Sequence, residues 1–355
     1  MNNPGQIRPA TAGPTFDPVL REDFAELASR VNVDALNGTR WLICGATGLV
    51  PAYLCDFLAW LRMEAGISMA LSLWVRSAAK TAGRFPWLRR GDDVVVPDWS
   101  NPSQWELPEA EFVVHAASPA TPAACVADPY GVLVCNALVT QRLVKAIPAS
   151  PLRGLLYLSS SEVYGSGAGP VPAEEALGRI DPEAPRSLYP LAKRLGESIV
   201  HEGGRSRGLP VRVARLFHTY GPGLDLNGDT RAFAEFVAMI VRGEVIRLRG
   251  DGRARRAYCY LADTCAALLT LLLHPDAPHV ANVGNPHAVL SVTDLAQVLM
   301  RLAGHPGAAD EGRSSDVQSL SGDIVPDISR LTQLGWEPRT CPEDGFARTL
   351  RFHSR

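Results

Sequence analysis

A glycine turn joins a short apolar run to an apolar helix near the start of the chain, and few folds accommodate that combination. Residues 40–44 predict a buried strand, GATG at 45–48 predicts a tight turn, and residues 49–63 predict a helix. At such a turn the backbone amides can approach a phosphate, and the positive end of the helix dipole adds to the attraction. The pattern favours an α/β fold that binds the diphosphate of a dinucleotide. The residues expected around it are Gly45, Thr47, Gly48, Leu49 and Val50.

The turn departs from the usual dinucleotide fingerprint at one position. A third glycine normally stands three residues after the second one and lets the helix pack closely on the strand. This chain has Pro51 there. Proline in a first helical turn removes no intrahelical hydrogen bond, so the helix can form, but its ring adds bulk where backbone usually passes.

Further strands are expected at residues 70–75, 93–97, 110–115 and 211–217, with helical stretches between them. The first of these ends at Arg76 instead of the acidic residue that would bind an adenosine ribose. Arg76 could contact a 2′-phosphate, stack on adenine or be solvated, and the sequence leaves these three options open. Strands that alternate with helices predict a Rossmann-type, doubly wound parallel sheet with a ligand crevice at the carboxyl ends of its strands.

A second polar cluster follows the strand expected at residues 154–158. That strand ends in Ser-Ser-Ser-Glu at 159–162, and the next helix carries Tyr189 and Lys193 four residues apart on one face. An ammonium near a phenol favours the phenolate, and a strand-end serine can hydrogen bond the same oxygen. The cluster predicts a proton relay beside a substrate hydroxyl. Taken alone, the same spacing is also typical of a half-buried tyrosine beside a solvated lysine.

The chain divides into three expected parts. Residues 1–38 predict an arm and a helix over 16–36, residues 39–220 the dinucleotide-binding domain, and residues 221–355 mainly a smaller substrate-binding lobe that caps the crevice. One long helix, interrupted near residues 129–131, is expected over 122–147. In the last part we expect helices at 261–273 and 291–302 and a short strand at 245–248.

Composition and charge argue against several classes of function. The formal net charge of −2 offers no general attraction for nucleic acid or for acidic lipid. The longest apolar runs are too short to span a bilayer, and the N-terminus lacks the apolar core of an export signal, so no membrane contact is expected. The seven cysteines contain no CxxC pair and fit a reducing cytoplasm. The eight histidines form no HxxxH or Cys-His cluster, so no metal site is expected.

The motifs, taken in order, resemble the extended short-chain dehydrogenase/reductase family of enzymes that modify nucleotide sugars, over about residues 37–352. The resemblance rests on the glycine turn, Asp98, HAASP at 115–119, Asn136, SSEVYG at 160–165, YxxxK at 189–193, HTYGP at 218–222 and the segment 326–338. It implies bound NAD in preference to NADP, a UDP-linked nucleotide-sugar substrate, and a homodimer formed through helices near 132–147 and 188–200. It also adds Asp98, Ala116 and Ala117 to the cofactor site.

Within that family the strand-end triplet is similar to that of the UDP-glucuronate decarboxylases. Sugar-nucleotide 4,6-dehydratases usually carry an Asp-Glu pair where this chain has Ser161 and Glu162, and simple 4-epimerases commonly lack the glutamate. The segment GRARRAYCY at 252–260 resembles the one that supplies an arginine to the sugar carboxylate, which maps to Arg256. A 4-epimerase, a dehydratase, and a protein of this fold that binds ligand without turnover are the alternatives.

The resemblance also implies roles for individual residues. Tyr189 takes the proton of the sugar 4-hydroxyl, Lys193 holds the nicotinamide ribose and lowers the pKa of the phenol, and Ser160 hydrogen bonds the reacting oxygen. Glu162 orients the substrate or moves a proton. The expected substrate contacts are Ser118, Ser161, His218 (an asparagine in relatives), Arg231 at the diphosphate and Arg256 at the carboxylate. The implied reaction oxidises C4 with NAD, loses carbon dioxide from C5, and yields UDP-xylose or the 4-keto pentose.

Overall fold

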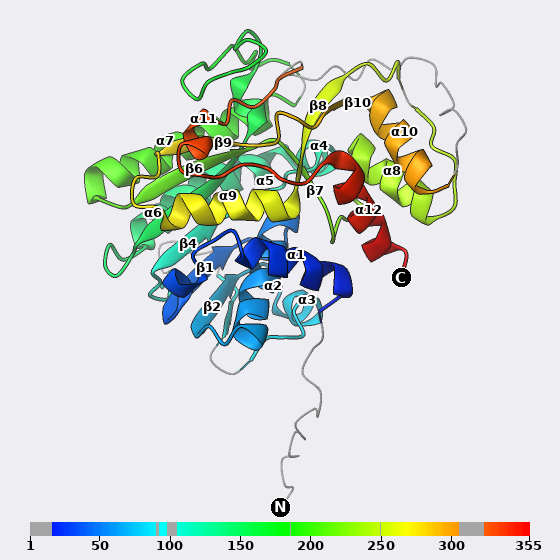
Figure 1. Cartoon of the computed structure of the whole chain (residues 1–355). Coiled ribbons are helices and arrows are strands. Elements are labelled where there is room, and N and C mark those ends of the chain that lie inside the picture. The colour runs from blue at the N-terminus through cyan, green and yellow to red at the C-terminus, as the bar shows by residue number, and fades with distance from the viewer. Residues whose placement is uncertain (1–15, 90–91, 98–104, 185, 249, 305–322) are drawn as a thin grey trace, which may run out of the picture.

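A seven-stranded parallel sheet forms the centre of the protein (Figure 1). The computed structural model describes residues 16–89, 92–97, 105–184, 186–248, 250–304 and 323–355. The strand order is β3-β2-β1-β4-β5-β6-β9, and every neighbouring pair is parallel. This confirms the predicted Rossmann-type, doubly wound sheet. Its strands are β1 (Thr39–Cys44), β2 (Met69–Trp74), β3 (Asp93–Val95), β4 (Phe112–His115), β5 (Gly154–Ser160), β6 (Val211–Leu216) and β9 (Val280–Val283).

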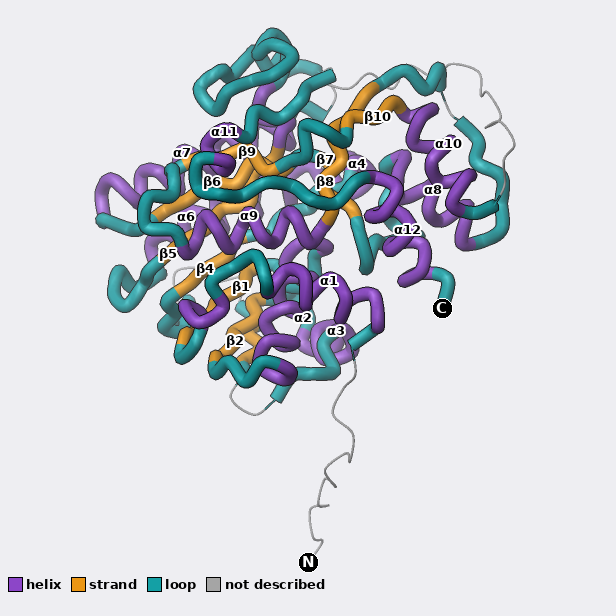
Figure 2. Tube along the Cα trace, in the orientation of Figure 1, coloured by secondary structure: helices purple, strands orange, loops and turns teal. Residues whose placement is uncertain are grey.

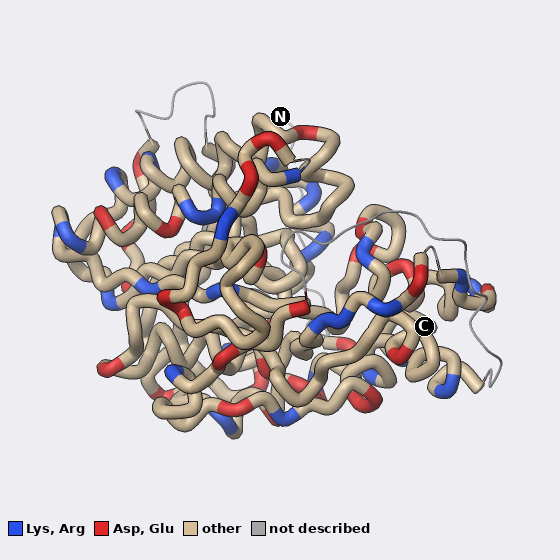
Figure 3. Tube along the Cα trace, turned by 90° about the horizontal axis from the view of Figure 1, so that it is seen from above, with Lys and Arg blue, Asp and Glu red and all other residues tan. Residues whose placement is uncertain are grey.

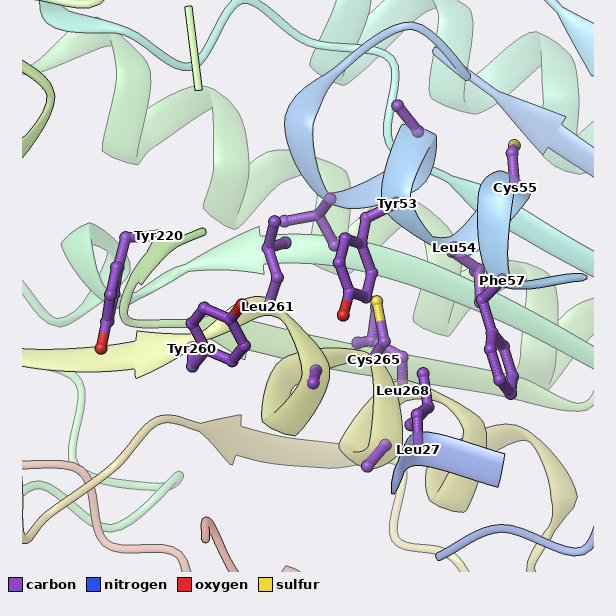
Figure 4. Packing of buried hydrophobic residues seen from close by; sticks show 14 of the residues in the cluster. Leu27, Tyr53, Leu54, Cys55, Phe57, Tyr220, Tyr260, Leu261, Cys265 and Leu268 are labelled. Carbon is purple, nitrogen blue, oxygen red and sulfur yellow. The ribbon is translucent and has the colours of Figure 1, made fainter. Parts of the chain in front are cut away.

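Helices cover both faces of this sheet (Figure 2). Side chains alternate along a strand, so a strand buried on both faces needs apolar residues in succession. In β1, Trp41 and Ile43 belong to the core shared with α2 (Leu49–Glu64) and α9 (Leu261–Leu273), part of which Figure 4 shows. Leu42 and Cys44 point to the other layer, formed with α6 (Thr140–Ala146) and α7 (Leu188–Arg207). The apolar run at the start of the glycine turn therefore fills two cores at once.

A smaller sheet and three helices lie beyond the carboxyl ends of the large sheet, and a fourth helix, α11, lies beside β9 and α9. The strands are β7 (His218–Tyr220), β8 (Arg255–Tyr260) and β10 (Val289–Ser291), in the order β10-β8-β7. The helices are α8 (Ala232–Val241), α10 (Val292–Leu302), α11 (Ser329–Thr332) and α12 (Pro342–His353). The chain after residue 220 also supplies α9 and β9 to the large sheet, so the predicted boundary at that residue stays a prediction.

Three of the expected elements differ in the structure. The helix expected over 16–36 is α1 (Pro18–Ala28) followed by a 3₁₀ turn, η1 (Val33–Leu36), and α3 (Ala78–Arg84) follows β2. Residues 245–248 form an isolated bridge at Arg247 and no strand, because Ile246 and Leu248 are buried by packing and not by ladder pairing. The helix expected over 122–147 is divided into α4 (Pro122–Ala127), α5 (Pro129–Leu133), a π-helical turn η3 (Val134–Val139) and α6. The prolines at 122 and 129 each start a helix.

No helix among the described segments combines the length and the apolar content needed to cross a bilayer. Lysine, arginine, aspartate and glutamate are interspersed over the surface instead of forming a field of one sign (Figure 3).

Candidate functional site

A cavity of about 510 Å³ opens where β1, β4, β5 and β6 end. Its walls come from the glycine turn, the loop after β4, the end of β5, the first turns of α7 and the strands β7 and β8. The predicted site residues that line it are Gly48, Leu49, Val50, Ala116, Ser118, Ser160, Ser161, Glu162, Tyr189, Lys193, His218, Arg231 and Arg256. One hollow therefore joins the expected cofactor turn to the expected sugar-binding residues.

Four predicted residues that the structure describes stand outside this lining. Gly45 and Ala117 lie just beneath the cavity, where a Cβ on Gly45 would come within 2.8 Å of the Ala117 Cα. Thr47 and Arg76 are exposed. Asp98 falls outside the described residues.

The glycine turn fits the diphosphate of a dinucleotide. Gly45 has a φ of +79°, which favours glycine, and its lack of a side chain lets the turn after β1 touch the turn after β4. Gly48 is the N-cap of α2, so the helix begins at Leu49 with free amides. Pro51, at the third helical position, lines the cavity and removes only an N–H that has no acceptor within the helix. The chain therefore accommodates the proline without losing the amides of Leu49 and Val50.

Tyr189, Lys193 and Ser160 lie together at one end of the cavity. The Lys193 ammonium donates a hydrogen bond of 2.7 Å to the carbonyl of Leu158 and lies 5.9 Å from the centre of the Tyr189 ring. Burial lowers the pKa of Lys193 to about 8. The pKa of Tyr189 lies well above its usual value, because burial and the Glu162 carboxylate disfavour the phenolate, while a hydrogen bond with Ser160 opposes them. Tyr189 can accept a proton only as the phenolate. That form needs positive charge nearby, which Lys193 can supply from the next helical turn.

Gly196 and Tyr157, which the sequence analysis did not single out, determine how closely α7 approaches the sheet. A Cβ on Gly196, three residues after Lys193, would lie 2.2 Å from the Tyr157 hydroxyl. That hydroxyl donates to Asn136 Oδ1 over 2.9 Å, and Asn136 Nδ2 donates to Ser118 Oγ over 2.8 Å. The π-helical turn places Asn136 at this point, which is a common use of such turns at functional sites. The signal in the sequence was a glycine on the same helix face as Tyr189 and Lys193.

A charged corner lies beside Tyr189 in the same cavity. Arg231 is held by Asp229 through hydrogen bonds of 2.9, 3.0 and 2.5 Å. Arg256 donates 2.6 Å to the carbonyl of Arg255 and lies 3.4 Å from Asp323. Both guanidiniums are thus anchored by the protein before any ligand arrives.

Arg186 is the functional candidate that sequence reasoning did not find. It lines the cavity, and its guanidinium lies 3.7 Å from Glu162 Oε1, too far for a hydrogen bond. Its Nε and Glu162 Oε2 are both buried without a partner. Among the described residues it is also the one non-glycine residue with a left-handed φ, +67°, a conformation that costs roughly 1–2 kcal/mol. Strain and unpaired polar atoms at one spot indicate a position arranged for a ligand.

The protonation of this corner follows from its burial. The pKa of Glu162 is raised because desolvation disfavours its carboxylate, with Arg186, Arg256 and Arg231 opposing that shift. Burial, together with Arg256 and Arg231, lowers the pKa of His218 to about 3, so its imidazole is neutral at physiological pH. The arginines of this corner can therefore bind an anion, and Glu162 takes up a proton at a higher pH than an exposed glutamate does.

The model of the NAD dependent epimerase/dehydratase family matches residues 41–284. UDP-glucuronic acid decarboxylase 1 of Xenopus tropicalis is 31% identical over 245 residues, which are 69% of this chain and 57% of that protein. UDP-glucuronic acid decarboxylase 3 of Arabidopsis thaliana is 30% identical over 244 residues, 68% of this chain and 69% of that protein. The chain therefore spans little more than half the length of the Xenopus relative.

A solved structure of UDP-glucuronic acid 4-epimerase from Bacillus cereus, in complex with UDP-glucuronic acid and NAD, shares the fold with a TM-score of 0.73. It is 21% identical, and the match covers 88% of this chain and 98% of that one. The segment matched by the family model contains the glycine turn, the end of β5, the Tyr189–Lys193 pair and β8. These parts of the cavity thus all lie within the matched segment, and the chain belongs to the NAD-dependent epimerase/dehydratase family, the extended short-chain dehydrogenases/reductases.

Proposed function

We propose that this protein is an NAD-dependent nucleotide-sugar decarboxylase that converts UDP-glucuronate to UDP-xylose or to the 4-keto pentose. The observation that carries the proposal is the charged corner beside Tyr189, where Glu162 and Arg186 each keep an unpaired buried polar atom. A hexose with a C5 carboxylate can occupy both: the carboxylate accepts from Arg186, and a sugar donor satisfies Glu162. The named decarboxylases at about 30% identity support the same substrate class.

Different residues of the cavity serve different steps of the proposed reaction. Tyr189 accepts the proton of the C4 hydroxyl, and Ser160 holds the same oxygen by a hydrogen bond. Bound NAD supplies the oxidation at C4 and the final return of hydride to that carbon. With C4 a ketone, the C5–C6 bond breaks, its electron pair moves to the C4 oxygen, and carbon dioxide leaves. C5 then takes up one proton, for which Glu162, with its raised pKa, is the suitably placed acid.

We also propose NAD as the cofactor in preference to NADP. The helix start at Leu49 and Val50 binds the diphosphate that both share, so the choice depends on the end of β2, where Arg76 is exposed and does not line the cavity. A cofactor that is reoxidised within each turnover needs no link to a reducing pool. We expect calorimetry on cofactor-free protein to show that NAD binds more tightly than NADP. The affinity for NAD should be the same in Arg76→Ala as in the wild type. Tighter binding of NADP, lost in Arg76→Ala, would assign Arg76 to the 2′-phosphate.

Arg186→Gln is expected to raise KM for UDP-glucuronate by about 10-fold or more, because a charge-assisted hydrogen bond to the carboxylate is lost. Glutamine tolerates the left-handed backbone no better than arginine, so the variant removes charge without relieving strain. Steady-state kinetics with UDP-glucuronate, and calorimetry with UDP-glucose, which lacks the carboxylate, separate the roles. Arg242→Gln, which breaks an exposed pair with Glu244, is the matched control. An equal loss for both sugars would remove Arg186 from carboxylate recognition.

A 4-epimerase is the second candidate, because the Bacillus cereus enzyme of the same fold bears that name. A 4,6-dehydratase is less well supported, since Ser161 stands where those enzymes usually carry an aspartate. Incubating the protein with NAD and a panel of nucleotide sugars, and reading the products by mass spectrometry, distinguishes the three reactions. Loss of carbon dioxide, no change in mass and loss of water are the respective outcomes.

A homodimer and a cytoplasmic location complete the proposal. Tyr130, Val134, Leu138 and Leu195 on α5, η3 and α7 expose between 40% and 79% of their surface, which suits a helix-bundle contact with a second copy. All seven cysteines are free, which suits a reducing compartment. We assign residues 39–220 mainly to the cofactor and residues 221–355 mainly to the nucleotide sugar.

A further inference from the structure

Helix α1 precedes the segment that the family model matches, yet it contacts helices of both parts of the molecule. It packs against α2, α9 and α12, between which it lies in Figure 1. Phe24 holds it to α2, with its ring centre 5.1 Å from that of Tyr53 and 5.7 Å from that of Phe57. This apolar side places α1 firmly on the cofactor-binding part.

An adjoining side of α1 is acidic and faces a basic side of α12. Arg348 pairs with Asp23 at 2.8 Å and with Glu26 at 3.1 Å. Two further pairs continue the seam, Arg351 with Glu22 at 2.5 Å and Arg355 with Asp17 at 3.0 Å. Helix α12 in turn contacts α8, α10 and β8. The seam therefore joins α1 to the elements around the small sheet.

Asp23 is the central point of this connection, and it is fully buried. Its Oδ2 accepts from the Tyr53 hydroxyl over 2.9 Å and from the Tyr260 hydroxyl over 2.6 Å, and its Oδ1 accepts from Arg348 over 2.8 Å. The three donors come from α2, from the end of β8 and from α12, and Figure 4 shows the two tyrosines. Burial raises the pKa of Asp23, while these hydrogen bonds oppose the rise.

The two tyrosines connect Asp23 to both ends of the cavity. Tyr53 stands four residues after Leu49, at which the helix of the glycine turn begins. Tyr260 stands four residues after Arg256 on β8. We infer that Asp23 is a positioning residue, which fixes the separation between the cofactor turn and the strand that carries Arg256. The inference rests on the proposed function only in taking a nucleotide sugar as the ligand of that strand.

Replacing Asp23 with asparagine should disturb the separation between the cofactor turn and β8 more than it disturbs the structure of either one. The amide keeps the shape but presents N–H groups to donors, so at least one tyrosine hydroxyl or the guanidinium loses its acceptor. A buried donor without a partner favours displacement of its strand, and β8 belongs to the small sheet, where it pairs with β7 and β10, and not to the large sheet that holds the cofactor turn. Helix α2 stays packed between β1 and α9, so the cofactor turn should change little.

The test compares Asp23→Asn with Glu22→Gln, which removes one exposed pair of the same helix. Both are made in the Tyr189→Phe background, so that ligands bind without turnover, and are studied well below their unfolding temperatures. We expect Asp23→Asn to lower the affinity for UDP-glucuronate by about 10-fold and to keep the affinity for NAD within about 2-fold of the parent. Glu22→Gln should bind both ligands as the parent does. Hydrogen–deuterium exchange should be faster at residues 255–260 and unchanged at 49–53.

The positioning role would be overturned if Asp23→Asn bound UDP-glucuronate and NAD equally more weakly, or bound both as the parent does, and hydrogen–deuterium exchange at residues 255–260 were unchanged. If the parent with intact Asp23 binds NAD but no UDP-glucuronate, the proposed function fails. The exchange comparison of residues 255–260 then decides the role of Asp23 by itself.

Discussion

Replacing Tyr189 with phenylalanine should lower kcat for UDP-glucuronate by about 100-fold or more and leave the fold and the NAD content unchanged. The variant removes one hydroxyl from a ring that is 8% exposed and packs with Val132 and Ala192. The ring contacts therefore persist, while the acceptor for the C4 proton is lost. Steady-state kinetics and the absorbance of an acid extract of the purified protein measure the two quantities.

Tyr164→Phe is the matched control for that experiment. Tyr164 is also a fully buried tyrosine, and its hydroxyl donates 2.6 Å to Asn282. Loss of this hydroxyl should reduce thermal stability and leave kcat within a few-fold. If Tyr189→Phe also keeps kcat within a few-fold of wild type, Tyr189 has no part in proton transfer.

Glu162→Gln is expected to lower kcat by roughly 100-fold, on the scale of a lost proton-transfer group, with a smaller effect on KM. The amide keeps the size of the side chain but cannot exchange a proton with C5 and cannot pair with the Arg186 charge. Because Glu162 acts as the protonated acid and burial raises its pKa, wild-type kcat should fall as the pH rises through a value above the ordinary pKa of a glutamate. The pH profile of kcat measures this, and the limb should be absent in the variant.

Glu175→Gln provides the comparison for Glu162, because Glu175 also pairs with an arginine, Arg330, but is 72% exposed. It should behave as wild type. A Glu162→Gln enzyme that loses affinity without losing kcat would show that the carboxylate only orients the sugar.

Local sequence patterns predicted most of the large sheet. Apolar runs bounded by glycine, serine or charged residues correspond to β1, β2, β4, β5 and β6, because a strand buried on both faces requires successive apolar residues. The strand β9 was not expected, since its place beside β6 depends on pairing with a segment about 65 residues earlier, which periodicity does not encode. The bridge at residue 247 was mistaken for a strand because an apolar pair in a buried loop resembles one.

The site was predictable where its residues belong to motifs and was not predictable where backbone or long-range contacts place them. Tyr189, Lys193 and Glu162 lie in the cavity as their spacing suggested. Arg186 escaped notice because arginine gives no sign of a left-handed backbone, which glycine or asparagine would have signalled. Asp23 escaped notice because its partners Tyr260 and Arg348 are 237 and 325 residues away.

The proposed function makes one central claim, which is that the C5 carboxylate leaves as carbon dioxide. Purified protein with NAD and UDP-glucuronate labelled in the carboxyl carbon tests that claim directly, with Tyr189→Phe as the blank. We expect labelled carbon dioxide to appear in step with a UDP-pentose and no net NADH when UDP-xylose is the product. No labelled carbon dioxide, with UDP-glucuronate converted to its C4 epimer instead, would contradict the decarboxylase proposal and favour the 4-epimerase.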